Sequence, residues 1–78
     1  MASRMRQGKY GMTRPRIDNI LGTVVICRGQ FANIKGEIIG NRNDHMQYLT
    51  VQVPSEYNSR VYILNLLYDQ CKNIQWRN

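Results

Sequence analysis

Basic and aromatic side chains gather around one turn-rich stretch of this 78-residue chain, "RGQFANIKGEI" at residues 28–38. Arg28 and Lys35 each stand beside a glycine of the stretch, and Phe31 lies between them. Arg42 lies in the next predicted reversal. Cationic side chains neutralise phosphates, in binding that weakens steeply as salt rises. We therefore predict that these four residues contact nucleic acid or a partner; the alternative is that the three cations are ordinary solvated charges.

The sequence shows no group of residues suited to catalysis or to metal binding. Catalysis requires a nucleophile and a base within hydrogen-bond reach. The one histidine, His45, lies in the polar reversal "NRNDH", and the five acidic residues are scattered along the chain. Cys27 and Cys71 are too far apart in sequence for a CxxC metal or redox pair. We therefore expect no catalytic residue, no metal and no cofactor.

The net charge of +6 is concentrated at the amino-terminal end. The basic residues of this end are Arg4, Arg6, Lys9, Arg14 and Arg16, and no acidic residue accompanies them. The stretch has two glycines, a proline and no apolar period, so it lacks the means to offset the entropy of ordering. We predict a flexible arm over residues 1–19. It is either a linker or a basic arm that docks on nucleic acid, with Arg14 and Arg16 among its contacts.

Beyond the arm, apolar residues recur with a period of two, which is typical of half-buried strands. The predicted strands cover residues 23–28, 36–40, 46–53, 60–64 and 72–76. Their inward-facing residues are Val24, Ile26, Ile38, Leu49, Val51, Val53, Val61 and Ile63. The stretch "NLLYDQ" predicts one helical turn with Asn65 as its cap. Five short strands and this turn predict an all-β fold for residues 20–78, a small, strongly bent antiparallel barrel.

The loop between the first two predicted strands depends on particular residue types. Gly29 allows a backbone conformation or a close approach that a β-carbon would resist. Asn33 is among the non-glycine residues that best tolerate positive φ, so it completes the turn. Gly36 permits the bend that a small barrel needs at its corner. Phe31 is then expected to fold back over the end of the barrel.

The spacing Val24-x-Ile26-x-x-Gly29-(six residues)-Gly36-x-Ile38 is similar to the KOW motif of SH3-like barrels, found in NusG-type transcription elongation factors and in some ribosomal proteins. The stretch "RIDNILGTVVICRGQFANIKGEIIG" most resembles a KOW repeat of the large, NusG-like subunit of the eukaryotic elongation factor DSIF. The resemblance implies a non-catalytic, monomeric module of a larger nuclear protein. It also implies contacts with RNA polymerase and with nascent RNA or nearby DNA, which are expected to be weak and largely sequence-independent.

Two other classes of protein remain open. One is a ribosomal or ribonucleoprotein component that binds RNA through its KOW module, and the other is a protein-interaction barrel of an RNA-processing factor. Ribosomal proteins usually spread basic residues over the folded body, whereas this barrel is nearly neutral by count. Ala32 and Asn33 also stand where family loops often carry Lys-Gly. Both observations favour protein docking combined with weak contact to nucleic acid.

The remaining aromatic residues have two interpretations each. Tyr48, Tyr57 and Tyr62 fall in or near predicted strands and turns, where their rings either stack on bases or complete the core with the hydroxyl outward. Trp76 and Leu67 near the end of the chain are candidates for apolar contacts with a partner protein. The chain has no apolar stretch of the roughly 20 residues that a membrane helix requires, so we expect no membrane contact.

Overall fold

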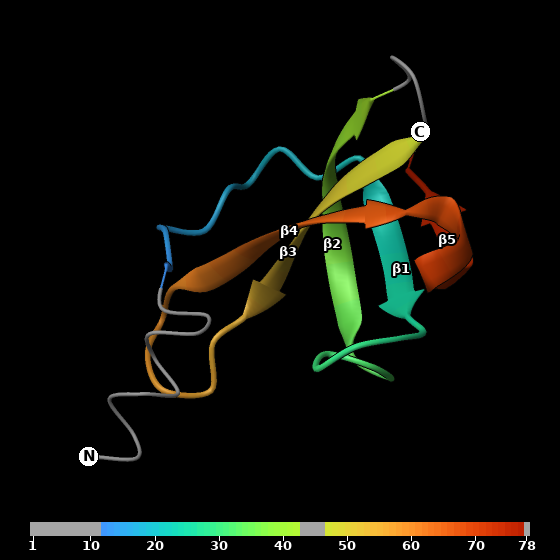
Figure 1. Cartoon of the computed structure of the whole chain (residues 1–78). Helices are drawn as coiled ribbons and strands as arrows, with labels where there is room; N and C mark the ends of the chain where they lie inside the picture. Colours follow the sequence, from blue (N-terminus) through green and yellow to red (C-terminus); the bar gives the residue numbers. More distant parts are fainter. Residues whose placement is uncertain (1–11, 43–46, 78) are drawn as a thin grey trace.

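The computed structural model describes residues 12–42 and 47–77. Five strands and one short 3-10 helix account for the regular structure of these residues (Figure 1). They are β1 (Gly22–Ile26), β2 (Lys35–Arg42), β3 (Tyr48–Pro54), β4 (Val61–Leu67), η1 (Tyr68–Gln70) and β5 (Cys71–Trp76). The predicted all-β class with one helical turn is therefore confirmed.

All five strands belong to one antiparallel sheet with the order β4-β3-β2-β1-β5. Consecutive strands pair from β1 to β4, and the chain then crosses through η1 so that β5 pairs with the other side of β1. The register shifts between Thr23 and Val25 and between Ile38 and Gly40, and such irregularities bend strands and increase their twist. The strongly curved strands wrap into a small SH3-like barrel (Figure 1).

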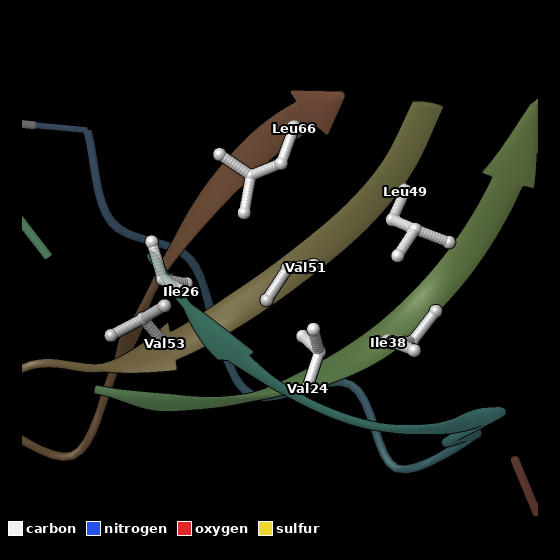
Figure 2. Close-up of a cluster of buried hydrophobic side chains, with 7 residues drawn as sticks. All are labelled: Val24, Ile26, Ile38, Leu49, Val51, Val53 and Leu66. Atoms are coloured by element: carbon white, nitrogen blue, oxygen red, sulfur yellow. The ribbon is translucent and has the colours of Figure 1, made fainter. Parts of the chain in front are cut away.

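The core is formed by seven buried aliphatic residues that point toward one another inside the barrel (Figure 2). Six of them were predicted from the two-residue period, and all six are at most 1% exposed. The seven are Val24, Ile26, Ile38, Leu49, Val51, Val53 and Leu66. Alternation of side chains along β1, β2 and β3 therefore places the residues on either side of each core position outside the barrel.

Strand β4 presents the opposite face from the one that the sequence predicts. Residues directly paired across two strands lie on the same face of the sheet, and Leu66 pairs with the core residue Leu49. The core face of β4 therefore carries Leu64 and Leu66, and the prediction that Val61 and Ile63 face inward is wrong. Val61 is still buried, at 3% exposed, but it lies outside the core cluster.

The helical turn begins two residues later than predicted. Asn65 is not its cap, because β4 continues to Leu67 and the Asn65 side chain accepts a hydrogen bond from the Thr50 hydroxyl across the sheet (3.0 Å). The turn is stabilised instead by Gln70, whose side-chain oxygen accepts a hydrogen bond from the Leu67 N–H (2.9 Å). The turn thus serves to redirect the chain from β4 into β5.

Residues 12–19, hereafter the amino-terminal segment, lie against β3 and β4 (Figure 1). The backbones of Arg14 and Val61 exchange two hydrogen bonds of 2.9 Å, and the backbone of Ile17 bonds to the side chain of Gln52. These bonds fix residues 13–17 in the folded part, so the chain departs here from the flexible arm predicted over residues 1–19. Residues 1–11 of that arm lie outside the described residues.

Candidate nucleic-acid and partner interface

The loop of residues 27–34 connects β1 to β2 and has the backbone conformations that its residue types favour. Gly29 has φ of 85° and Asn33 has φ of 69°, which confirms the turn predicted for this stretch. The Asn33 N–H donates to the Ile26 carbonyl (2.6 Å) and the Ile34 N–H to the Phe31 carbonyl (3.1 Å). The loop is therefore held by its own backbone, and its side chains project from a fixed frame.

Gly36 follows the loop at the start of β2, where its role is close packing. A β-carbon at this position would overlap the side chain of Val51 and lie 3.3 Å from the Gln52 carbonyl oxygen. The absence of a side chain lets β2 approach the core residues of β3. Gly36 therefore seats the loop-bearing end of β2 on the barrel.

Phe31 folds back over the end of the barrel, as predicted. Its ring packs on Tyr62 of β4, with centroids 5.4 Å apart and planes inclined by 49°, and it also contacts the core cluster. Beside this pair lies a hollow of about 160 Å³. We name it the aromatic hollow. It is lined by Gln30, Phe31, Ile34, Pro54, Glu56, Tyr57 and Tyr62. The loop after β1 and the loop after β3 thus meet at one end of the barrel.

A second hollow lies across Pro54 from the first and has a different character. It is lined by Arg16, Thr23, Lys35, Glu37, Pro54, Asn58, Ser59, Arg60 and Val61, and we name it the cationic hollow. Lys35 forms no ion pair with any residue that the structure describes. The guanidinium of Arg60 bonds to the uncharged Thr13, through its hydroxyl (3.0 Å) and its carbonyl (3.0 Å). Neither cation is therefore ion-paired to a residue in the described part of the chain.

The Arg16 side chain lines the same hollow, but it forms a structural contact within the chain. Its guanidinium donates to both carboxylate oxygens of Glu37, at 2.6 and 3.3 Å, and lies 3.7 Å from Asp18. The bond from Arg16 lowers the pKa of Glu37; burial acts in the opposite direction, and a hydrogen bond from Gln52 (2.9 Å) lowers it further. Arg16, predicted as a free contact of the arm, therefore anchors the amino-terminal segment.

The structure separates Arg42 from the other predicted contact residues. Arg42 is the last residue of β2, not part of a reversal, and Lys35 is the first. At a rise of about 3.3 Å per residue, the two lie about 23 Å apart along the strand. Arg28 and Lys35 flank the loop at one end of the barrel, whereas Arg42 lies at the far end of β2. Arg14, also predicted, is exposed beside β4.

Two cations that sequence reasoning left out belong to this region. Arg60 lines the cationic hollow. The sequence contained a signal for this role, because Arg60 belongs to the polar reversal before β4. Lys72 pairs with Val25, which on its other side pairs with Lys35. Paired residues share a face, so the two lysines stand on the outer face of the sheet about 10 Å apart, two strand spacings of about 4.8 Å. Only the pairing of β5 with β1 reveals this neighbour.

The other predicted residues occupy separate places. Tyr57 is 61% exposed, whereas Tyr48 is half-buried at the start of β3. Trp76 is 47% exposed and pairs with Gly22, the first residue of β1, so it lies at the barrel end opposite the loop of residues 27–34. His45 lies outside the described residues.

The remaining chemistry of the described residues is limited. Among them, no three His, Cys, Asp or Glu side chains gather as metal ligands would. Cys27 and Cys71 are half-buried free thiols, and burial raises the pKa of Cys71. No helix in the part of the chain that the structure describes is long and apolar enough to span a membrane. Comparison of the chain with protein-family models, curated proteins and solved structures gave no match.

Proposed function

We propose that this chain is a non-catalytic KOW-type module of a nuclear transcription elongation factor, which contacts RNA polymerase and nascent RNA or nearby DNA. The observation that carries the proposal is the fixed loop of residues 27–34. It holds Arg28 and Lys35 at the same end of the barrel as the aromatic hollow, and it occupies the KOW-like spacing between β1 and β2. The resemblance of that stretch to an elongation-factor repeat supplies the class of partner.

The module acts by position and not by chemistry. A fixed backbone presents the loop side chains without an ordering cost at each contact, which is how rigid scaffolds support binding loops. Lys35 and Arg60 attract phosphates without regard to sequence, while apolar and polar loop groups dock on protein. The arm residues Arg4, Arg6 and Lys9 add attraction of the same sequence-independent kind.

A salt-titrated binding series with single-stranded RNA and duplex DNA tests the nucleic-acid contact. We expect Arg28→Ala and Lys35→Ala each to weaken binding to the single strand and to reduce the salt slope by about 0.7, the value for one phosphate contact. Arg42→Ala is the matched control, because it removes an equal charge at the other end of β2. Slopes that fall equally for all three variants would assign binding to overall charge and remove the loop from the interface.

Co-purification tests the protein partner. We expect the chain to recover RNA polymerase subunits, and Phe31→Ala to reduce that recovery because Phe31 covers the loop-bearing barrel end. Recovery of ribosomal particles in their place would assign the chain to a ribonucleoprotein. Retained partner binding without any affinity for RNA or DNA at low salt would identify a pure protein-interaction barrel.

A further inference from the structure

We infer that the aromatic hollow receives one base of a single-stranded nucleic acid, while the adjoining cationic hollow holds the neighbouring phosphate through Lys35 and Arg60. The inference rests on the proposed function and deepens it, because it names the form of nucleic acid and the groups that bind it. It adds Tyr57, Tyr62 and Arg60 to the interface, none of which the loop motif contains.

The walls of the aromatic hollow are suited to stacking. Phe31 and Tyr62 pack on each other, so their rings are fixed, while Tyr57 stands 61% exposed on the facing loop. That loop is also ordered, because the Tyr57 N–H donates to the Ser55 hydroxyl (3.1 Å) and the Ser55 N–H donates to the Arg60 carbonyl (3.0 Å). Aromatic side chains held this way stack on any base, since every base has a π-face.

The two hollows lie on either side of one rim. Pro54 lines both of them, and successive residues of the chain divide between them, with Ile34 in the aromatic hollow and Lys35 in the cationic one. Along β4 the division follows from the alternation of side chains, since Tyr62 lines the aromatic hollow and Val61 the cationic one. A strand of nucleic acid that crosses the rim at Pro54 therefore places a base on the aromatic side and a phosphate on the cationic side.

The geometry favours an unpaired strand. Inside a duplex both faces of a base are covered by stacking, so only a single-stranded or extruded base enters an aromatic pocket. The surrounding charge favours a phosphate over a cationic ligand. Neither Lys35 nor Arg60 is ion-paired to a described residue. Glu37, the one acidic residue lining the cationic hollow, is paired with Arg16, whereas Glu56 lines the aromatic hollow. A methylated ammonium ligand, which aromatic groups and a carboxylate also attract, is the competing occupant.

An oligonucleotide without bases provides the sharpest test. We compare a short single strand with an abasic strand of equal length and charge, in RNA and in DNA, by fluorescence anisotropy at fixed salt. The 78-residue chain is expected to bind the base-bearing strand about 5-fold or more tightly than the abasic strand, the usual effect of one stacked base. Tyr57→Ala is expected to bind both strands equally, with its salt slope unchanged. A preference for the RNA or the DNA strand identifies the sugar that the site accepts.

Three control variants complete the design. Trp76→Ala removes an exposed aromatic side chain from the opposite end of the barrel, so it should keep the wild-type preference for bases. Tyr57→Phe keeps the ring and should keep the preference as well. Glu56→Gln removes the negative charge that lines the aromatic hollow and should tighten binding of the single strand.

Two results would overturn the inference. One is a Tyr57→Ala chain that still prefers the base-bearing strand, and the other is binding of a trimethyllysine peptide that Glu56→Gln abolishes. In either case the proposed function stands if Lys35→Ala still reduces the salt slope. A chain that binds neither nucleic acid nor polymerase would instead refute the proposed function itself.

Discussion

At the scale of single residues, Glu37 is the side chain that joins the amino-terminal segment to the sheet. Its carboxylate accepts hydrogen bonds from Arg16, at 2.6 and 3.3 Å, and from Gln52, at 2.9 Å. All of these bonds are made to the charged form, which is why the pKa of Glu37 lies below its ordinary value of 4.5. The ionised carboxylate thus links residues that are far apart in the sequence.

The pKa of Glu37 leads to a prediction for stability against pH. Because its pKa is lower in the folded chain than in the unfolded chain, its contribution is present above the unfolded pKa and is lost as pH falls through the folded pKa. We expect the free energy of unfolding to fall on acidification below about pH 4.5. Glu37→Gln should flatten that fall, measured by urea denaturation across the acidic range. Equal pH dependence in both chains would contradict the prediction.

Single residues also show where sequence reasoning stops. The left-handed conformation of Asn33 follows from local backbone preference, so it was predictable. The ion pair of Arg16 was not, since its partner is 21 residues away and only the fold brings them together. Lys72 is a similar case, because it joins the face of Lys35 through two strand pairings. A cation's role depends on its neighbours in space, which charge counts do not reveal.

At the scale of elements, β4 is the strand whose sequence pattern is compatible with either face being turned to the core. Its sequence "VYILNLL" carries apolar residues on both faces, so a period of two does not choose between them. Pairing with β3 decides the matter, because Leu66 lies opposite Leu49 in the core. The other face matters as well, since it carries Val61 and Gln52, which bond to Arg14 and Ile17 of the amino-terminal segment. Strand β3, which carries Thr50 and Gln52 on the face opposite its core residues, left no such ambiguity.

Gln52 on β3 supports a prediction about this outer covering. Its side chain is fully buried and bonds to both backbone groups of Ile17, at 3.0 Å and 2.7 Å. Gln52→Leu keeps the volume but leaves those groups without a partner, so we expect a loss of about 1–3 kcal/mol in unfolding free energy. Amide exchange at Ile17 should also become faster, as measured by NMR.

The matched control for this variant lies on the same strand and face. Thr50→Val removes the hydroxyl that bonds to Asn65 at an exposed position, where the cost should be well below that of Gln52→Leu. If both variants lose the same stability, the buried amide does not hold the amino-terminal segment, and the prediction fails.

At the scale of the whole molecule, the barrel has two unlike ends. The loops after β1 and β3 form the end with the aromatic hollow, while Arg42 and Trp76 belong to the other. The KOW-like spacing predicted the first end because it specifies one local turn. The cationic hollow lies beyond such reasoning, since residues from the amino-terminal segment, β1, β2 and the loop before β4 line it together.

Truncation tests whether the amino-terminal segment belongs to the folded unit. We expect a chain that begins at residue 18 to unfold at lower denaturant than one that begins at residue 12. The shorter chain lacks the bonds of Arg14 and Ile17, each worth about 0.5–1.5 kcal/mol, so the difference should be about 2 kcal/mol or more. Equal midpoints in urea would show that the barrel is complete without the segment.

The two backbone hydrogen bonds between Arg14 and Val61 also hinder association of the chain with other copies of itself. Strand β4 ends the sheet, and unpaired N–H and C=O groups along such a border invite another chain to extend the sheet, which leads to aggregation. Arg14 occupies both groups of Val61 and brings a charged side chain to the border. Arg14 thus hinders intermolecular growth of the sheet at this edge, and a version of the protein that lacks Arg14 would need another way to block it.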